Sequence, residues 1–179
     1  MVYLFLANGF EEIEALTPLD MLRRAGIETV SVSINDGREV TGAHGITVVA
    51  DKTIKNTQPT DIDAVILPGG LPGADNLRND TAVNMFIDEA IKQNKLVCAI
   101  CAAPRILGEK GLLKGKKAIC YPGFEKYLEG ATITDVGCVV DGNIITSKGM
   151  GKATEFALEI ITALKDRESA NKIKESIFS

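Results

Sequence analysis

The sequence contains a single histidine, His44, and this scarcity limits the chemistry open to the protein. Hydrolases that use a Cys-His-Asp triad need an imidazole beside the nucleophile. His44 lies between Gly42 and Gly45, far upstream of every cysteine. A histidine in a surface turn is the simplest interpretation, and a position lining a site near a subunit boundary is the alternative. We therefore expect no peptidase triad.

Positive charge is also scarce. Lys and Arg number 20 against 24 Asp and Glu, which gives a net charge of -4 and no basic stripe for nucleic acid. The densest basic cluster, Lys114–Lys117, is interpreted as a solvated loop. The apolar start, Met1–Ala7, lacks a basic leader and is too short to span a membrane. We expect no nucleic-acid or membrane partner and a cytoplasmic location.

The four cysteines do not form the pattern of a small disulfide-rich secreted domain, so reduced thiols are expected. Cys98 and Cys101 form a C-x-x-C, but along one strand they would lie roughly 10 Å apart. That exceeds the reach of a disulfide, about 7 Å between Cα atoms. With no second C-x-x-C and no ligand-like spacing at Cys120 and Cys138, no metal is expected. Neither a Walker loop nor a dinucleotide motif is present, and we expect no cofactor.

What the sequence does contain is an alternation of short apolar runs with longer helical patterns. This alternation is typical of an α/β protein with a mostly parallel sheet, and residues 1–179 are expected to form a single domain. Pro18 fits the first helix only if that helix begins near Glu14. The expected strands are 2–7, 29–34, 64–67 and 96–100, with hairpins over 40–49 and 139–146 and helices over 14–25, 81–93, 153–164 and 168–177.

Cys101 is the leading candidate for a functional residue. It follows the apolar run Leu96–Ile100 and precedes the small residues Ala102-Ala103-Pro104, which open a helical pattern. A thiol at such a strand-to-helix corner is exposed by the turn, and a helix N-terminus favours its thiolate. The alternative is a buried structural thiol. We expect Cys101 to be a thiolate at neutral pH and the most easily oxidised cysteine.

Two other segments are expected at the carboxyl ends of strands, where open α/β sheets bind ligands. Gly69-Gly70 leaves its main-chain N–H groups free to hold an oxyanion, although an ordinary turn is the alternative. Glu11, Glu12 and Glu14 crowd the start of the first helix, where the helix dipole favours acidic residues. One of them, buried near the thiol, would have a raised pKa and serve as a proton donor. The sequence does not choose among the three.

These segments together resemble the ThiJ/PfpI superfamily, in particular its Parkinson-disease-associated deglycase ("DJ-one", YajL-like) branch. The motifs that carry the resemblance are Asn8–Glu14, Leu67–Gly70, Ala99–Pro104 and Thr146–Gly149, in the family's order along nearly the whole chain. The resemblance implies a flavodoxin-like sandwich and a homodimer. It also implies roles for the matching residues: Cys101 as nucleophile, Glu14 as its carboxylate partner, and Gly70 and Ala102 as main-chain donors. Possible lining residues are Gly69, Tyr121, His44 and Arg24, with the first helix around Arg23 and Arg24 at the dimer contact.

The sequence departs from the family pattern at three positions. Ala102 stands where many members have a histidine after the cysteine, which disfavours the protease-like and heat-shock-chaperone branches. Tyr121 stands where some deglycase-branch members have a histidine before proline. A tyrosine does not replace imidazole as a base near neutral pH. Met150 lies between Gly149 and Gly151, where relatives often have proline. Glu14 would therefore have to act as both acid and base.

Two classes of function follow from these residues. The first is a cofactor-free glyoxalase or deglycase that acts through Cys101 and Glu14 on methylglyoxal-like aldehydes or on glycated adducts. The second is a non-enzymatic redox sensor or chaperone that responds to oxidation of Cys101.

Overall fold

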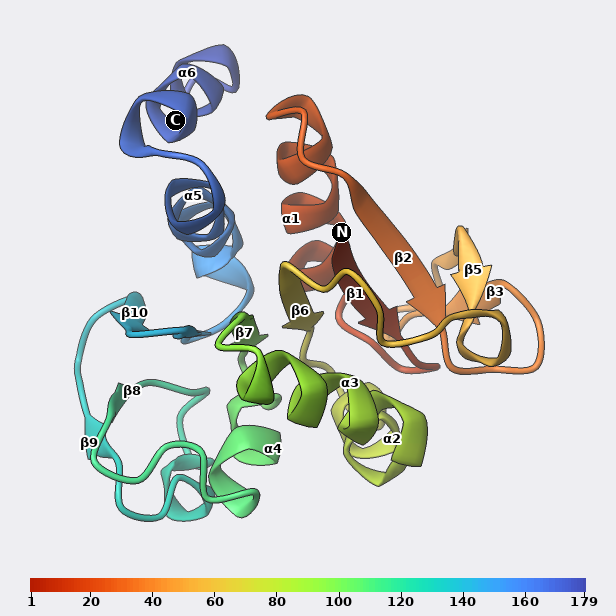
Figure 1. Cartoon of the computed structure of the whole chain (residues 1–179), viewed down its shortest axis with the longest axis horizontal. Coiled ribbons are helices and arrows are strands. Elements are labelled where there is room, and N and C mark those ends of the chain that lie inside the picture. The colour runs from red at the N-terminus through yellow and green to blue at the C-terminus, as the bar shows by residue number, and fades with distance from the viewer.

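A seven-stranded sheet with strand order β10-β11-β7-β6-β1-β2-β5 runs through the molecule (Figure 1). The structure is a computed structural model that describes all 179 residues. The strands are parallel apart from β10, which pairs antiparallel with β11 at one edge. Their bounds are β1 (Val2–Leu6), β2 (Thr29–Ser33), β5 (Lys52–Thr53), β6 (Ala64–Leu67), β7 (Leu96–Ile100), β10 (Cys138–Asp141) and β11 (Ile144–Ser147). The expected flavodoxin-like α/β arrangement is confirmed.

Helices cover both faces of this sheet (Figure 1). Successive residues of β1 point to opposite faces, so that Phe5 belongs to one buried apolar cluster and Leu4 to the other. The Phe5 cluster includes residues of α2 (Gly73–Asn79), α3 (Thr81–Lys92) and α4 (Pro104–Glu109). The Leu4 cluster includes residues of α1 (Glu12–Arg24), α5 (Ala153–Leu164) and α6 (Arg167–Ser176). The sheet is therefore the middle of three layers.

The remaining elements are short. The expected hairpin near His44 is present as β3 (Glu39–Thr41) and β4 (Thr47–Val49), and it forms a sheet of its own. A second small sheet joins β8 (Lys117–Ala118) and β9 (Thr132–Ile133), and 3-10 turns form at η1 (Ile54–Asn56), η2 (Glu125–Tyr127) and η3 (Met150–Lys152). β5, β8, β9 and α2 were not predicted, because elements this short carry too little hydrophobic periodicity to identify.

The first helix differs from the sequence-based expectation. It begins at Glu12 rather than near Glu14, with the side chain of Glu11 as its N-cap. Pro18 therefore lies inside the helix and removes the main-chain hydrogen bond to the carbonyl of Glu14. The helix continues past the missing hydrogen bond because its inner face, which includes Leu22, is buried against the sheet. Packing of the amphipathic face outweighs the lost bond.

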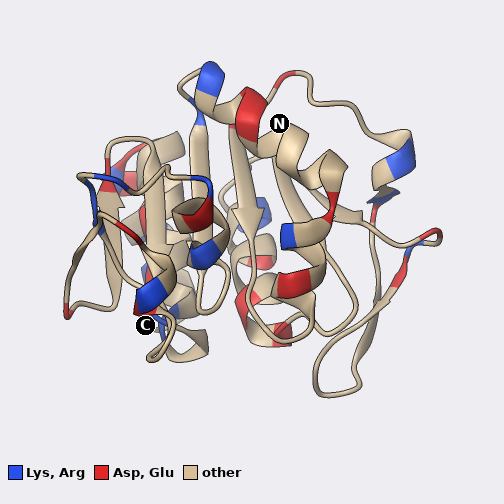
Figure 2. Ribbon diagram, turned by 90° about the horizontal axis from the view of Figure 1, so that it is seen from below, with Lys and Arg blue, Asp and Glu red and all other residues tan.

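The parallel strands bring three distant segments to one edge of the sheet. β1 pairs with β6 and β6 with β7, and all three run in the same direction. The residues that follow them, Gly9, Gly69 and Cys101, are therefore neighbours at the carboxyl edge. Charged residues of both signs are interspersed along the chain (Figure 2). None of the helices has the length and apolar character needed to cross a lipid bilayer.

Candidate active site

Cys101 occupies a tight turn directly after β7. Its φ is 65°, in the left-handed region that residues other than glycine seldom adopt. Two main-chain hydrogen bonds hold this conformation: Cys101 N–H donates to the carbonyl of Ser147 (2.9 Å), and its carbonyl accepts from Tyr121 N–H (2.8 Å). The side chain is half-buried. The surrounding structure thus fixes the thiol at the corner that the sequence predicts.

The structure selects Glu14 from the three clustered glutamates. Its side chain is almost completely buried, hydrogen-bonds to the thiol of Cys101, and accepts a 3.0 Å hydrogen bond from Gly69 N–H through Oε2. A Cβ added at Gly69 would lie 2.5 Å from that oxygen and 2.7 Å from Cβ of Cys101. Only glycine therefore allows the carboxylate and the thiol to approach each other here.

Main-chain donors complete the site. The N–H groups of Gly70 and Ala102 hydrogen-bond to the sulfur of Cys101. Gly70 has a φ of 85°, and a Cβ there would lie 2.3 Å from the main-chain nitrogen of Glu11. Glycine is required at this position for both reasons. The fold thus brings together the thiol of Cys101, the carboxylate of Glu14 and the main-chain donors that the sequence suggested.

The protonation of the pair differs from the expectation. Burial raises the pKa of Glu14 to about 7, although hydrogen bonds from Cys101 and from Gly69 N–H oppose the shift. Burial and the adjacent Glu14 charge raise the pKa of Cys101 to about 12, against the opposing donors Ala102 and Gly70. Both shifts favour a protonated thiol in the resting protein, opposite in direction to the predicted Cys101 thiolate. The short helix α4 and two N–H groups do not outweigh burial beside a carboxylate.

Glu11, Glu12 and His44 form a separate cluster whose ligand atoms lie within 4.8 Å of one another. Glu12 accepts from His44 N–H through Oε1 (2.8 Å) and lies 2.8 Å from His44 Nδ1 through Oε2. Both carboxylate oxygens of Glu12 are thus engaged by His44, so hydrogen bonding accounts for the cluster. His44 joins the β3–β4 hairpin to the start of α1, and it is not among the groups in contact with Cys101.

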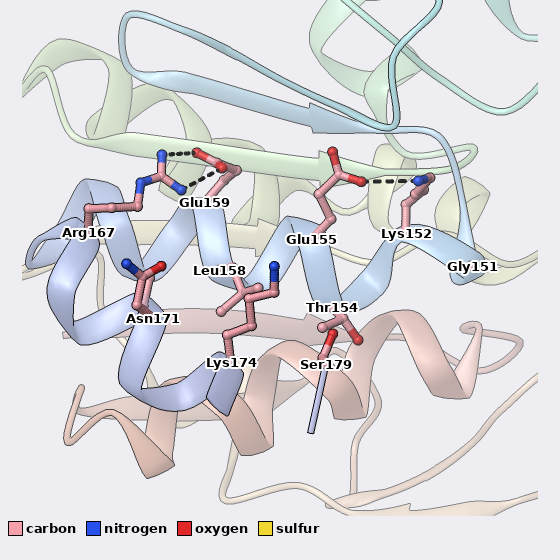
Figure 3. A pocket seen from close by; sticks show the side chains of 11 residues that line it. Gly151, Lys152, Thr154, Glu155, Leu158, Glu159, Arg167, Asn171, Lys174 and Ser179 are labelled. Atoms are coloured by element: carbon pink, nitrogen blue, oxygen red, sulfur yellow. Dashed lines mark hydrogen bonds and ion pairs between the residues drawn. The ribbon is translucent and has the colours of Figure 1, made fainter. Parts of the chain in front are cut away.

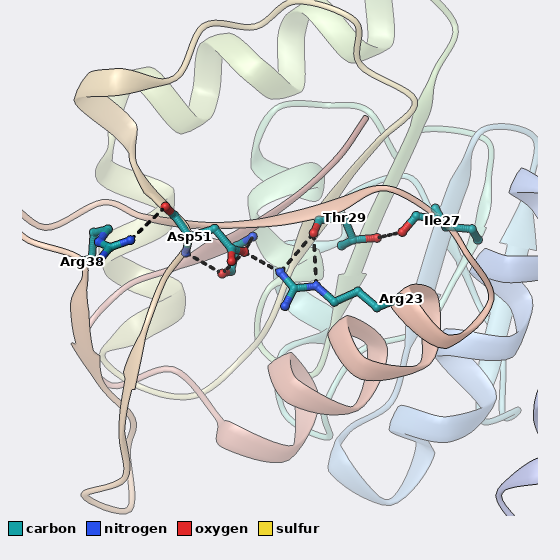
Figure 4. A network of polar contacts seen from close by, with 6 residues as sticks. Arg23, Ile27, Thr29, Arg38 and Asp51 are labelled. Carbon is teal, nitrogen blue, oxygen red and sulfur yellow. Dashed lines mark hydrogen bonds and ion pairs between the residues drawn. The ribbon is translucent and has the colours of Figure 1, made fainter.

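The arginines of α1 lie away from the thiol. Arg24 is ten residues beyond Glu14 on the same helix, an axial separation of about 15 Å. Arg23 belongs to a polar network with Asp51 and main-chain groups of β2 (Figure 4). The fold of one chain brings neither arginine to Cys101, and their expected place at a subunit boundary stays a prediction.

Tyr121 lines a hollow of about 360 Å³ beside the carboxylate. A Cβ added at Gly149 would lie 3.4 Å from the Tyr121 ring and 3.9 Å from Oε1 of Glu14, so Gly149 separates the ring from the carboxylate. The hollow is lined by Tyr121, Pro122, Lys148, Gly149, Met150, Gly151 and Lys152. In the sequence, Met150 stands out only as a departure from the family pattern between Gly149 and Gly151. That departure was the signal that the residue borders the site.

The comparisons with known proteins agree with this geometry. A model of the DJ-1/PfpI family matches residues 1–163. The chain belongs to the DJ-1/PfpI family. It is 33% identical over 174 residues to protein dj-1beta of Drosophila melanogaster, covering 96% of this chain and 93% of that protein. The solved structure of oxidized DJ-1 from Toxoplasma gondii superposes with a TM-score of 0.95 at 38% identity, covering 99% of this chain and 97% of that one. The resemblance inferred from the motifs is confirmed.

Some relatives are much longer. The chain is 37% identical over 167 residues to protein DJ-1 homolog B of Arabidopsis thaliana. That match covers 92% of this chain but 38% of the plant protein. The DJ-1/PfpI chain therefore spans less than half the length of this relative.

A second hollow, of about 400 Å³, lies between α5 and α6 (Figure 3). Four of its charged groups are paired, Arg167 with Glu159 (2.9 Å) and Lys152 with Glu155 (3.2 Å). Its lining contains no cysteine or histidine. It therefore offers no thiol or imidazole comparable to the Cys101 site.

The other cysteines lie outside this site. All four cysteines are free, as expected. Cys98 and Cys120 are buried in the two apolar clusters, whereas Cys138 is half-buried like Cys101. Burial raises the pKa of Cys138 to about 12, and the nearby charges of Glu155 and Glu159 add to the shift. Cys138 is thus the natural comparison for the reactivity of Cys101.

Proposed function

We propose that this chain is a cysteine-dependent stress-response protein of the glyoxalase or deglycase type, which uses no cofactor. Its substrates would be methylglyoxal-like aldehydes and their early glycation adducts. The observation that carries the proposal is the contact between the Cys101 thiol and a carboxyl group, Glu14, whose pKa is about 7. A group with this pKa takes up and releases protons readily at neutral pH.

The first step is addition of the thiol to the aldehyde. Glu14 carboxylate takes the S–H proton while the sulfur of Cys101 bonds to the aldehyde carbon. The N–H groups of Gly70 and Ala102 hold the oxygen as it gains negative charge. Protonated Glu14 then returns the proton to this oxygen, which gives a hemithioacetal. Because Glu14 activates the thiol during the reaction, the raised pKa of resting Cys101 is compatible with the step.

The second step moves a hydrogen between carbons. Glu14 removes the C–H proton of the hemithioacetal carbon and passes it to the neighbouring carbonyl oxygen, which forms an enediol. Glu14 then takes the hydroxyl proton of the first carbon and delivers it to the second carbon, so that the first carbon becomes a thioester. Water hydrolyses the thioester to lactate and the free thiol of Cys101. Methylglyoxal plus water equals lactic acid, so the balance requires no external oxidant or reductant.

The test is lactate formation from methylglyoxal by wild type, Cys101→Ser and Glu14→Gln. We expect turnover by wild type and a loss of at least about 100-fold in both variants, the order of a lost acid–base catalyst. Cys138→Ser is the matched control, because it removes the other half-buried thiol, which lies outside the site. If wild type turns over methylglyoxal no faster than Cys101→Ser does, the proposed enzymatic activity is ruled out.

The second candidate is a non-enzymatic redox sensor or chaperone. The half-buried thiol of Cys101 favours it, because peroxide reaches such a group more readily than a core cysteine. The Toxoplasma relative is itself described as oxidized. A protonated Glu14 would donate a hydrogen bond to an oxygen of the oxidised sulfur. Absence of turnover together with a change in stability on peroxide treatment would support this candidate.

The proposal includes a homodimer in the cytoplasm, where thiols stay reduced. Exposed apolar side chains near the start of α1 and on the β3–β4 hairpin are consistent with a contact there: Ile13, Ile46 and Val49. Sedimentation at micromolar concentration is the test, and a monomer alone would remove the dimer from the proposal.

A further inference from the structure

Residues 119–121, directly after β8, connect the end of β11 to the turn that carries Cys101. The main-chain N–H of Ile119 donates to Oγ1 of Thr146 on β11 (3.0 Å). The main-chain N–H of Tyr121 donates to the carbonyl of Cys101 (2.8 Å). The two donors are two residues apart, which limits the separation of their Cα atoms to about 7 Å. The hydroxyl of Thr146 therefore helps to fix the place where Tyr121 meets the turn.

The other main-chain bond of this turn also comes from the end of β11. The N–H of Cys101 donates to the carbonyl of Ser147 (2.9 Å), the residue after Thr146. β11 is itself held in register with β7, where Thr146 lies opposite Ala99. Both bonds that hold the left-handed φ of Cys101 (65°) thus depend on two consecutive residues of β11. Such a conformation persists only where the surrounding structure fixes it.

The hydroxyl of Thr146 lies where solvent does not reach. Thr146 is 1% exposed and Ile119 is 4% exposed. Ala118 and Cys120, which flank Ile119, belong to the Phe5 cluster. A buried N–H that loses its acceptor is destabilising, because neither protein nor water replaces the bond. An apolar side chain at position 146 would therefore force residues 119–121 to shift toward another acceptor.

We infer that Thr146 is a positioning residue for Cys101, whose turn it holds through the main-chain N–H groups of Ile119 and Tyr121. Its hydroxyl does not touch the sulfur, and it acts through the main chain alone. The hydrogen-bonding part of the inference is independent of the proposed function. The effect on aldehyde turnover rests on the proposed function.

The consequence of this arrangement is a fixed position for the thiol. The sulfur of Cys101 receives hydrogen bonds from the N–H groups of Gly70 and Ala102, and it lies beside the carboxyl group of Glu14. A turn that loses one of its two anchors would displace the sulfur from these groups. A misplacement of about 1 Å is enough to reduce a rate by about 100-fold.

The first experiment measures amide hydrogen exchange by NMR in wild type, Thr146→Val and Thr146→Ser. Valine is close to threonine in shape but has no acceptor, whereas serine keeps the hydroxyl. We expect the protection of Tyr121 N–H, relative to the amides of β1, to fall at least about 10-fold in Thr146→Val and to be retained in Thr146→Ser. Thr146→Ala also lacks the acceptor and takes the place of Thr146→Val if that variant does not fold.

Thr57→Val is the matched control for exchange. Thr57 is 7% exposed, and its hydroxyl bonds to the carbonyl of Thr53 (2.8 Å), away from the Cys101 site. This variant loses a buried hydroxyl without touching residues 119–121. Unchanged protection of Tyr121 in Thr146→Val, or an equal loss in Thr57→Val, would overturn the inference.

The second experiment measures the thiol itself. Cys101 is alkylated with iodoacetamide, and peptide mass spectrometry gives its rate relative to Cys138 in the same molecule. We expect Thr146→Val to slow Cys101 by at least about 10-fold, because the sulfur moves away from the carboxylate that takes up its proton, with Thr146→Ser and Thr57→Val unchanged. An unchanged or faster rate in Thr146→Val would contradict the positioning role.

The lactate assay separates this inference from the proposed function. We expect Thr146→Val to lower kcat with little change in KM, because the reacting groups move relative to one another, and Thr146→Ser to restore kcat. If wild type forms no lactate, the proposed function fails, whereas the exchange and alkylation results still decide the role of Thr146. Full kcat in Thr146→Val would show that this residue does not position the thiol.

Discussion

The main-chain N–H of Gly69 donates a 3.0 Å hydrogen bond to Oε2 of Glu14, a residue 55 positions earlier in the chain. The bond joins the carboxyl end of β6 to the first turn of α1. It also aims the carboxylate at the thiol of Cys101, because one of its oxygens is held by the backbone. The contact depends on glycine, since any side chain at this position would occupy the space between the two reacting groups.

Gly69→Ala should therefore separate Glu14 from Cys101. The new methyl group would lie 2.5 Å from Oε2 of Glu14, so the carboxylate must move. We expect a loss of about 1–3 kcal/mol in the free energy of unfolding, typical of overpacking, and at least about 100-fold in aldehyde turnover. Chemical denaturation and the lactate assay measure the two effects. Gly37→Ala is the control, because a Cβ there meets nothing within 4 Å; equal effects of both substitutions would contradict the prediction.

Stability should depend on pH through Glu14. The folded pKa of about 7 lies above the usual 4.5, so the native state binds more protons than the unfolded state between these values. The free energy of unfolding therefore falls as pH rises from about 4.5 to 7. A shift of this size corresponds to at most about 3 kcal/mol. Urea denaturation across this pH range measures it.

Glu14→Gln removes the titrating group and is the matched variant for this measurement. Its stability relative to wild type should rise as pH increases through the same window and then level off. A difference between the two proteins that stays constant from pH 4.5 to 8 would show that the pKa of Glu14 is not raised.

Oxidation should concentrate on Cys101. Mild peroxide meets a half-buried thiol beside a carboxylate that takes up its proton, whereas Cys98 and Cys120 are enclosed in the core. We expect most of the added oxygen on Cys101 by peptide mapping, and less sulfinate in Glu14→Leu, which lacks the hydrogen-bonding carboxyl group. Cys138 tests the explanation, because it is half-buried and its side-chain hydrogen bond is to Ser147 rather than to a carboxylate. Equal oxidation of Cys101 and Cys138 would show that solvent exposure alone determines which cysteine peroxide oxidises.

His44 should titrate above its usual pKa of 6.5. The hydrogen bond to Glu12 raises the pKa of this imidazole, and the charges of Glu12 and Glu11 add to the shift. The chain has no other histidine, so NMR detects a single titration. Glu12→Gln should lower the pKa markedly, and Glu11→Gln less, because Glu11 lies farther from Nδ1 (3.3 Å). The reverse order would contradict the geometry.

The same pair should contribute stability at acidic pH. Because the folded pKa of His44 is raised, its contribution is complete below pH 6.5 and is lost as pH rises through the folded value. The excess stability of wild type over His44→Ala should therefore decrease with rising pH. An excess that grows with pH would show that the neutral imidazole is the stabilising form.

The sequence by itself determined the layers of the fold and the position of the Cys101 thiol. The apolar runs at 64–67 and 96–100 predicted buried parallel strands, because such strands are apolar on both faces. The residue after the second run had to lie at the carboxyl edge of the sheet, which placed Cys101 in the site. Local pattern suffices for these features because neighbouring residues in the chain set them.

Only the tertiary structure decided which carboxylate contacts the thiol and in which direction the pKa values of the two groups shift. Glu11, Glu12 and Glu14 look alike along the chain, but one caps α1, one binds His44, and the third faces Cys101. The pKa values of Glu14 and Cys101 depend on burial and on groups more than fifty residues apart. The apolar hollow at Tyr121 and Met150 likewise forms between loops that are distant in the chain. These properties arise from desolvation and from contacts across the sheet edge, which no local pattern encodes.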